Sequence, residues 1–289
     1  MPLRSHFPRN GFTLIELSIV LVIIGLIVGG ILAGRDLIRA SELNYIISQI
    51  GKYDTAAQTF RNKYGQIPGD ATNAVQFFGN AGGNASDNYT TSCMNMMSTS
   101  TNSQTCNGDG NGTFGGGGPG PANVEDDEGL LFWHHLSMAK LIDAGGLTAR
   151  HSYLNSGSSS WVLTGLNVPG SRISSNAGFS AFYLCVTTGS SYFLNGFCNH
   201  AYFYGAQDTG ANNNYLGINL YPVMSALDAY SIDKKIDNAL PATGTVMSLP
   251  PTGAASYQNN CTSSSTVATA TYTVTNSGIT CSLIFKAGF

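Results

Sequence analysis

The stretch from Gly11 to Gly34, GFTLIELSIVLVIIGLIVGGILAG, decides the architecture that the sequence predicts. Its apolar run is long enough to cross a membrane, which takes about 20 helical residues. A glutamate, Glu16, stands near the start of this run. Because a charged side chain at the centre of the bilayer costs on the order of 2.5 kcal/mol or more, a simple anchor would lack it. Glu16 therefore either lies at the headgroup interface or has a partner.

The segment ahead of this run is polar and basic. Residues 1–11 include Arg4 and Arg9, and the apolar run begins abruptly at Phe12. A secretory signal peptide has the same order, but its apolar core ends after 7–15 residues at a small-residue cleavage site. Here the core continues to Ala33 without such a site. The change in character comes before the apolar run, not after it.

The helical pattern continues beyond the apolar run. Apolar residues recur at three- and four-residue steps as far as Tyr64, and no proline interrupts the chain before Pro68. One helix of roughly 80 Å is expected. Residues 12–34 are apolar on all sides and form its transmembrane half, while residues 35–64 are amphipathic. The amphipathic half needs a partner, and residues 65–289, expected to form one exported domain, can supply it.

The N-terminal signature is similar to that of a known family. The letters RNG followed by FTLIELSIVLVIIGLI resemble the type IV prepilin signature of type IV pilins and type II secretion pseudopilins, over about residues 8–64. The resemblance implies that residues 1–11 are a leader. It also implies that prepilin peptidase cleaves between Gly11 and Phe12 on the cytoplasmic side of the inner membrane. The same enzyme would methylate the new amine of Phe12.

The same resemblance gives Glu16 a role in assembly. It implies that this carboxylate meets the N-terminal ammonium of a neighbouring subunit. The physics agrees, because leaving either charge unpaired in a low-dielectric bundle costs several kcal/mol. The alternative is that Glu16 reaches the cytoplasmic headgroups by itself. Two interpretations also stay open for the helix glycines, which either allow close helix approach or soften the helix: Gly25, Gly29, Gly30 and Gly34.

Cysteine usage and composition place the rest of the chain outside the cytoplasm. Charged residues make up only 10% of the sequence and the net charge is −3, which does not favour nucleic-acid binding. The six cysteines fall into near-neighbour pairs that predict local disulfides in an oxidising compartment: Cys93–Cys106, Cys185–Cys198 and Cys261–Cys281. A zinc site would need closer spacing and further ligands. The Gly-, Asn- and Ser-rich residues 79–123 predict a long loop that the first pair partly closes.

A short motif in this loop suggests calcium. In NGDGNGT, oxygen-bearing side chains alternate at Asn107, Asp109 and Asn111, and Gly112 follows, as in the first half of a calcium-binding loop. The twelfth position is Gly118, so another carboxylate would have to complete the shell. Four acids near in sequence are candidates: Glu125, Asp126, Asp127 and Glu128. Some pseudopilins bind calcium near the globular domain. The alternative is a flexible Asn/Gly turn.

The remaining pattern predicts an α+β domain. Helices are expected within residues 124–146 and 225–240, the second capped by Ser225 with Asp228. We interpret His134 and His135 as core or surface residues, because neighbours on a helix point about 100° apart. Strands are expected in segments rich in β-branched and aromatic residues: 161–166, 180–188, 191–195, 200–207, 214–221, 266–274 and 279–285. The predicted fold is a long N-terminal helix packed against an antiparallel sheet with disulfide-closed loops.

These features predict a non-catalytic, pilin-like subunit. The nucleophile-elbow, zincin and phosphate-loop motifs are absent from the sequence. Expected partners are other pilin or pseudopilin subunits, prepilin peptidase and the inner membrane, with no cofactor other than a calcium ion. The expected location is the inner membrane with the domain in the periplasm, and a type IV pilus or type II secretion pseudopilus after assembly. The alternative is a surface adhesin that uses the pilin-type segment only as an anchor.

Overall fold

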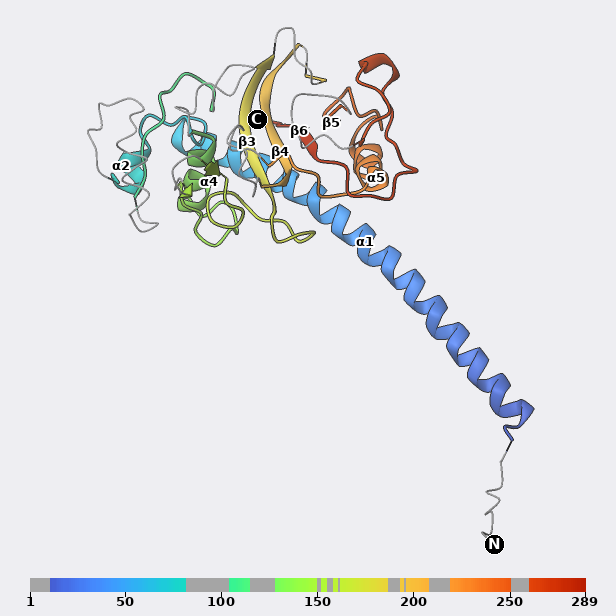
Figure 1. Ribbon diagram of the computed structural model, residues 1–289. Coiled ribbons are helices and arrows are strands. Elements are labelled where there is room, and N and C mark those ends of the chain that lie inside the picture. Colours follow the sequence, from blue (N-terminus) through green and yellow to red (C-terminus); the bar gives the residue numbers. More distant parts are fainter. Residues whose placement is uncertain are drawn as a thin grey trace. The chain divides into compact units, whose positions relative to one another are not determined.

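The computed structural model describes residues 11–81, 104–114, 128–149, 152–154, 158–160, 162–186, 193–194, 196–207, 219–250 and 260–289. The chain divides into two compact units, residues 1–43 and residues 44–289. One helix, α1 (Leu14–Tyr64), contributes to both (Figure 1). The long N-terminal helix expected from the sequence is therefore confirmed.

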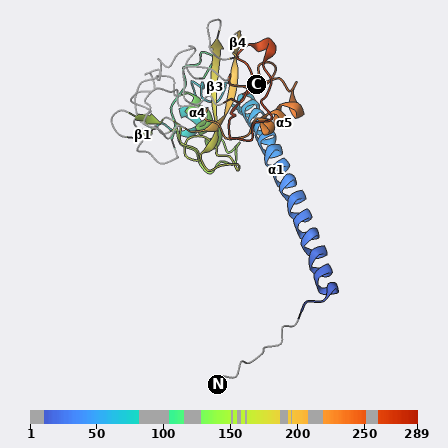
Figure 2. The ribbon, with the colours of Figure 1, turned by 45° about the vertical axis from the view of Figure 1, so that its right-hand side comes forward.

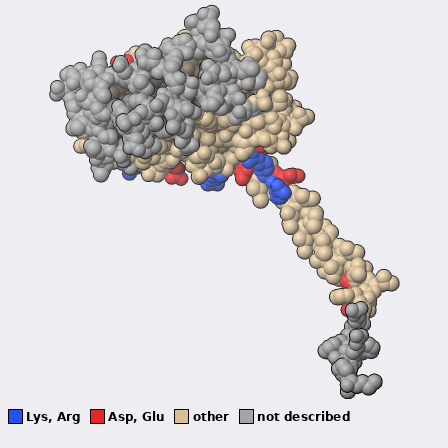
Figure 3. Space-filling model, in the orientation of Figure 1, with Lys and Arg blue, Asp and Glu red and all other residues tan. Residues whose placement is uncertain are grey.

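The part of α1 in the first unit is an exposed apolar rod. Each of its large apolar side chains from Leu14 to Ile38 is at least half exposed. On the face shown in Figure 3, the middle of this rod is an uncharged surface between charged groups near its two ends. Among the described residues, α1 is the helix that is long and apolar enough to cross a membrane, by length and composition.

The part of α1 in the second unit is amphipathic, and its apolar stripe is buried. The buried positions follow the helical period: Ile46, Ile50, Tyr53, Ala57 and Phe60. The Tyr53 ring lies 4.8 Å from the ring of Trp133 and 5.3 Å from that of Phe179, between ring centroids. These rings come from a second helix and from the sheet, so this half of α1 forms part of the core of the exported domain.

The sheet has four antiparallel strands in the order β3-β4-β6-β5. Their bounds are Ala177–Val186 for β3, Phe197–Ala206 for β4, Leu283–Lys286 for β6 and Val246–Ser248 for β5. The long strands β3 and β4 lie side by side in both ribbon views (Figures 1 and 2). A separate hairpin pairs β1 (Ser152–Leu154) with β2 (Ser158–Ser160). The α+β class is thus confirmed, with an antiparallel sheet.

Four of the expected strands are not strands where the structure describes them. Residues 193–194 lie in a turn, and residues 219–221 are irregular chain with an isolated bridge at Tyr221. Residues 162–166 form a turn, and residues 266–274 contain a 3₁₀ turn, Val267–Thr269, flanked by irregular chain. In the second segment the Ser264 hydroxyl accepts a hydrogen bond from the backbone N–H of Thr266, and the Thr269 hydroxyl donates to Ser264 Oγ. Such local bonds offer the backbone an alternative to a ladder. Expected strand residues 191–192, 195 and 214–218 lie outside the described part of the chain.

The described part of the domain also contains three short helices. They are α2 (Ala74–Phe78), α4 (Glu128–Met138) and α5 (Ala226–Ile236). The start of α5 has the expected capping box, in which Ser225 and Asp228 bond each other's backbone N–H. The helix expected within residues 124–146 ends earlier, at Met138, and residues 124–127 lie outside the described ranges. Buried residues occur on all sides of α4 from Glu128 to Leu136.

Disulfides join strands and loops of the domain. Cys185 and Cys198 face each other in the β3–β4 register and are bonded, and Cys261 is bonded to Cys281. Both are the pairs that local spacing predicts. Cys106 is also disulfide-bonded. Its expected partner, Cys93, lies outside the described residues.

Candidate functional sites

The peptide bond between Gly11 and Phe12 lies in exposed, non-helical chain. Both residues are exposed and precede the first residue of α1, and Phe12 is 87% exposed. Nothing lies within 4 Å of the position that a Cβ on Gly11 would occupy. A peptide bond in non-helical, exposed chain is open to a protease. The residues of the leader before Gly11 lie outside the described part of the chain.

Glu16 caps its own helix. Its Oε2 accepts hydrogen bonds from the backbone N–H and from the hydroxyl of Thr13, each at 2.8 Å. In return, Thr13 Oγ1 accepts from the Glu16 N–H at 3.3 Å. This reciprocal pair is a capping box, with Thr13 just before α1 and the acid three residues later. The sequence signal for this cap is Thr-x-x-Glu, from Thr13 to Glu16, which the sequence analysis did not include.

These features point to one class of protein. Residues 7–32 match the prokaryotic N-terminal methylation motif. The motif is typical of type IV pilins and pseudopilins, and it implies a pilin-like protein that prepilin peptidase processes. Together with the apolar helix, the motif indicates an exported, membrane-anchored protein of a kind that is usually non-catalytic. Among curated proteins and among solved structures, none matches the chain.

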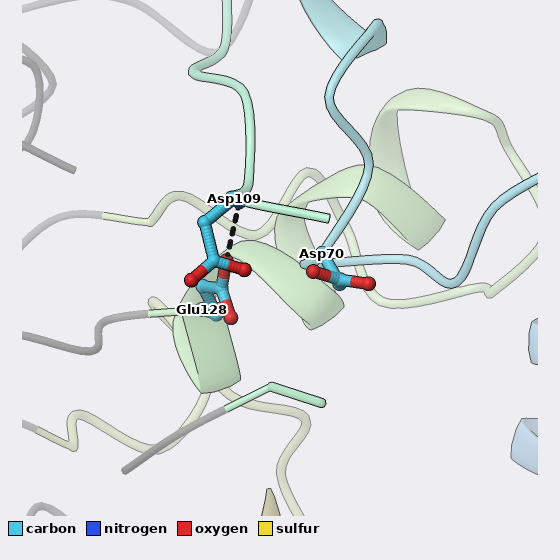
Figure 4. Close-up of side chains that lie close together, drawn as sticks. All are labelled: Asp70, Asp109 and Glu128. Atoms are coloured by element: carbon cyan, nitrogen blue, oxygen red, sulfur yellow. Dashed lines mark hydrogen bonds between the residues drawn. The ribbon is translucent and has the colours of Figure 1, made fainter. Parts of the chain in front are cut away.

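A second candidate site lies in the exported domain, where three carboxylates meet. Asp70 belongs to the turn after α1, Asp109 to the loop that follows Cys106, and Glu128 is the first residue of α4. One oxygen from each lies within 4.8 Å of the others (Figure 4). The side chains of Asp70 and Glu128 are buried, at 4% and 2% exposure, while Asp109 is exposed. We call these three residues the cup; two of its acids are buried and one is exposed.

Backbone contacts hold this cup in shape. Glu128 Oε1 accepts from the Asp109 N–H at 2.9 Å, and Asp70 Oδ2 accepts from the Gly112 N–H at 3.0 Å. The loop also approaches the turn closely at Gly108, whose N–H donates to the carbonyl of Ala71. A Cβ at Gly108 would overlap the backbone of Gly69 and Asp70, so only glycine allows this approach.

A buried histidine ties the same segments to α4. The Nδ1 of His135 accepts from the Gly69 N–H at 2.9 Å, so the neutral ring carries its proton on Nε2, which donates to the Cys106 carbonyl at 3.1 Å. Burial, with a smaller effect of His134, lowers the pKa of His135 to about 3. His134 is also buried and lies against the carbonyls of Leu147 and Gln104. Both histidines are core residues, as expected.

The cup differs from the ligand set that the sequence suggested. Asn107 Oδ1 accepts from the Val75 N–H, and Asn111 Oδ1 accepts from the N–H and hydroxyl of Thr113. Of the three alternating residues, only Asp109 joins the carboxylate cluster. Glu128 is the one of the four nearby acids that the structure describes.

Sequence reasoning missed Asp70 altogether. It lies far upstream of the motif, in the Pro68-Gly69-Asp70 turn that follows α1, and no spacing rule connects that turn to the loop. Burial raises the pKa of Asp70 to about 6, and Asp109 adds to the rise, while the N–H groups of Gly112 and Gly110 lower it. A carboxylic acid whose pKa is raised by burial and by a neighbouring acid is typical of a functional site.

Proposed function

We propose that this protein is cleaved between Gly11 and Phe12, methylated on Phe12, and assembled through α1 as a non-catalytic subunit of a type IV pilus or type II secretion pseudopilus. The methylation motif supports the processing step. In this proposal the exported domain lies within the unit Asn44–Phe289, which also includes the C-terminal part of α1. The partners are other pilin-like subunits, which reach this chain from within the inner membrane.

The observation that carries this proposal is the uncovered apolar part of α1. In its most apolar window of 18 residues, none of the side chains is buried. At roughly 25 cal/mol per Å² of apolar surface, leaving such a rod in water would be prohibitive. A membrane covers it in the lone subunit, and the helices of neighbouring subunits cover it in a fibre. A helix destined for one environment alone would not need the carboxylate of Glu16 near its tip.

The geometry of Glu16 suggests how it serves both environments. The bonds from Thr13 both use Oε2, so Oε1 points to no donor within the described chain. In the lone subunit, the capping box keeps the acid at the helix end, near the headgroups. In a fibre, Oε1 is available to the ammonium that cleavage creates on Phe12 of a neighbour. Thr13 acts here as a positioning residue, because it fixes the direction of the carboxylate.

The substitution Glu16→Gln tests this function. The amide can still accept the Thr13 bonds through its oxygen, so insertion, cleavage and folding should match the wild type. The neighbour's ammonium loses its counter-charge, and we expect incorporation into sheared fibres or pseudopili to fall at least tenfold at equal levels of cleaved protein. Asp143→Asn is the control, because it removes one exposed carboxylate from a part of the chain outside α1. Normal incorporation of Glu16→Gln would refute the assembly role.

A further inference from the structure

We propose that Asp70, Asp109 and Glu128 bind one divalent cation, Ca²⁺ in preference to Mg²⁺. The ion would join the turn after α1, the loop after Cys106 and the first turn of α4. The three residues come from segments that are distant in sequence, and the fold brings one oxygen of each within 4.8 Å of the others (Figure 4). The inference concerns the exported domain and does not depend on the proposed role in fibre assembly.

The observation that points to a ligand is an unsatisfied atom of Asp70. Its Oδ2 accepts from Gly112, but its Oδ1 is buried and has no hydrogen-bond partner among the residues that the structure describes. The Asp70 residue is only 4% exposed, and it forms no ion pair with a described Lys or Arg. A buried carboxylate oxygen without a partner is strongly unfavourable. A cation in the cup would supply the missing partner.

The ligand chemistry selects a hard cation. All three groups offer carboxylate oxygens, which suit Ca²⁺ and Mg²⁺ rather than the softer metals. Ca²⁺–oxygen distances of about 2.3–2.6 Å allow ligands up to about 5 Å apart, so oxygens within 4.8 Å fit around the ion as they stand. Mg²⁺ spans only about 4.2 Å at its shorter distances and gives up its water reluctantly. Three negative charges favour the ion that sheds its water more easily.

The exposed side of the cup supplies the entry path and room for water. Asp109 is exposed, so an ion can enter past it and keep water molecules on that side. Hydrogen bonds from Asn111 to Asp109 leave each carboxylate oxygen a further lone pair. Ca²⁺ takes six to eight oxygens, so water would complete the shell around the three protein groups. The proposal does not use the Asn107 and Asn111 side-chain oxygens: that of Asn111 already accepts two hydrogen bonds from Thr113, and that of Asn107 accepts one from Val75.

Calcium titration of the full chain in detergent tests the site. After treatment with a chelator, CaCl₂ is added from micromolar to about 5 mM, which spans the affinities of extracellular calcium modules. At 5 mM calcium, a Kd of about 0.1 mM lowers the unfolding equilibrium constant about fiftyfold and raises Tm by roughly 5–9 °C for a domain of this size, whereas a Kd of about 1 mM lowers it about sixfold and raises Tm by roughly 2–4 °C. Equal MgCl₂ should give a smaller rise. Equilibrium dialysis with radioactive calcium should give one ion per chain.

The variant Asp70→Asn separates a ligand from a merely structural acid. A ligand that is unpaired without the ion destabilises the metal-free fold, so Asp70→Asn without calcium should melt at or above the wild-type Tm. It should also lose the calcium-dependent rise. Asp143→Asn, the same change at an exposed acid of the same domain, should keep the full rise.

Three results would overturn the proposal. The first is a wild-type protein that neither binds calcium in dialysis nor gains Tm. The second is a calcium response that persists in Asp70→Asn or disappears in Asp143→Asn. The third is an Asp70→Asn chain that melts below the metal-free wild type or does not fold, since this would show that the carboxylate stabilises the fold by itself.

Discussion

The two halves of α1 offer a matched pair of substitutions, Ile46→Ala and Ile38→Ala. Both replace the same side chain in the same helix, so the change in helix propensity is equal at the two sites. Ile46 is fully buried, whereas Ile38 is 62% exposed. The difference between the two variants therefore isolates the contribution of burial in the exported domain.

The expected loss at Ile46 follows from its burial. Removing three methyl or methylene groups costs about 2.4 kcal/mol at ~0.8 kcal/mol each, and the cavity raises the total toward the 2–5 kcal/mol seen for such changes. The better helix propensity of alanine returns up to ~0.7 kcal/mol. A net loss of about 2–4 kcal/mol should lower Tm by roughly 5–15 °C. Ile38→Ala should change stability by no more than the propensity gain of up to ~0.7 kcal/mol.

Thermal unfolding of the full chain in detergent, followed by near-ultraviolet circular dichroism, measures both variants. Equal losses at the two positions would refute the reasoning, as would a stable Ile46→Ala protein, because α1 would then not contribute to the core of the exported domain. Ile38→Ala should instead weaken fibre incorporation, since the proposed function places that part of α1 against neighbouring subunits.

Three further predictions concern processing, the disulfides and pH. Mass analysis of the N-terminal peptide should find a chain that begins at Phe12 with a methylated amine; Gly11→Trp should leave the leader attached, and intact leader in wild-type cells that contain the peptidase would contradict cleavage. Replacing Cys185 and Cys198 by serine should lower stability by about 3 kcal/mol in the chain-entropy model, measured by urea unfolding, whereas unchanged stability would count against a closed disulfide in the exported protein. Burial, with Arg61 second, lowers the pKa of His200 to about 4, so between about pH 6.5 and 4 the unfolded chain binds a proton that the folded chain does not. The stability that the neutral His200 contributes is thus present above pH 6.5, and about 3 kcal/mol of it is lost as the pH falls to 4. In His200→Phe, the loss of stability between pH 7 and 4 should be smaller by about 3 kcal/mol. A variant with the pH profile of the wild type would contradict this prediction.

In the exported domain, local sequence patterns were sufficient to predict some elements of the fold and not others. The capping box at Ser225 and the strands around Cys185 and Cys198 depend on neighbouring residues, and the sequence predicted them. Residues 266–274 have the composition of a strand, yet they form turns. Composition indicates that a segment suits a pleated surface, but a strand also needs an edge with which to pair, and only the assembled sheet determines which edges remain.

The cup formed by Asp70, Asp109 and Glu128 shows how much of the candidate metal site the sequence could predict. The motif around Asp109 indicated oxygen ligands, because alternating oxygen side chains are a local pattern. Asp70 carries no comparable signal, and its place beside Asp109 depends on the close approach at Gly108 and on the His135 bridge to Gly69. These contacts join residues that are far apart in sequence.

The sequence by itself determined the N-terminal segment of this protein. The methylation motif, the apolar span and the Thr13–Glu16 cap are all linear signals within about 30 residues, and local helix geometry is enough to realise them. Tertiary structure decided the rest: which face of α1 is buried, which strands pair, and which acids meet. Those outcomes depend on contacts between distant segments, whose free energy exists only when the whole domain has packed.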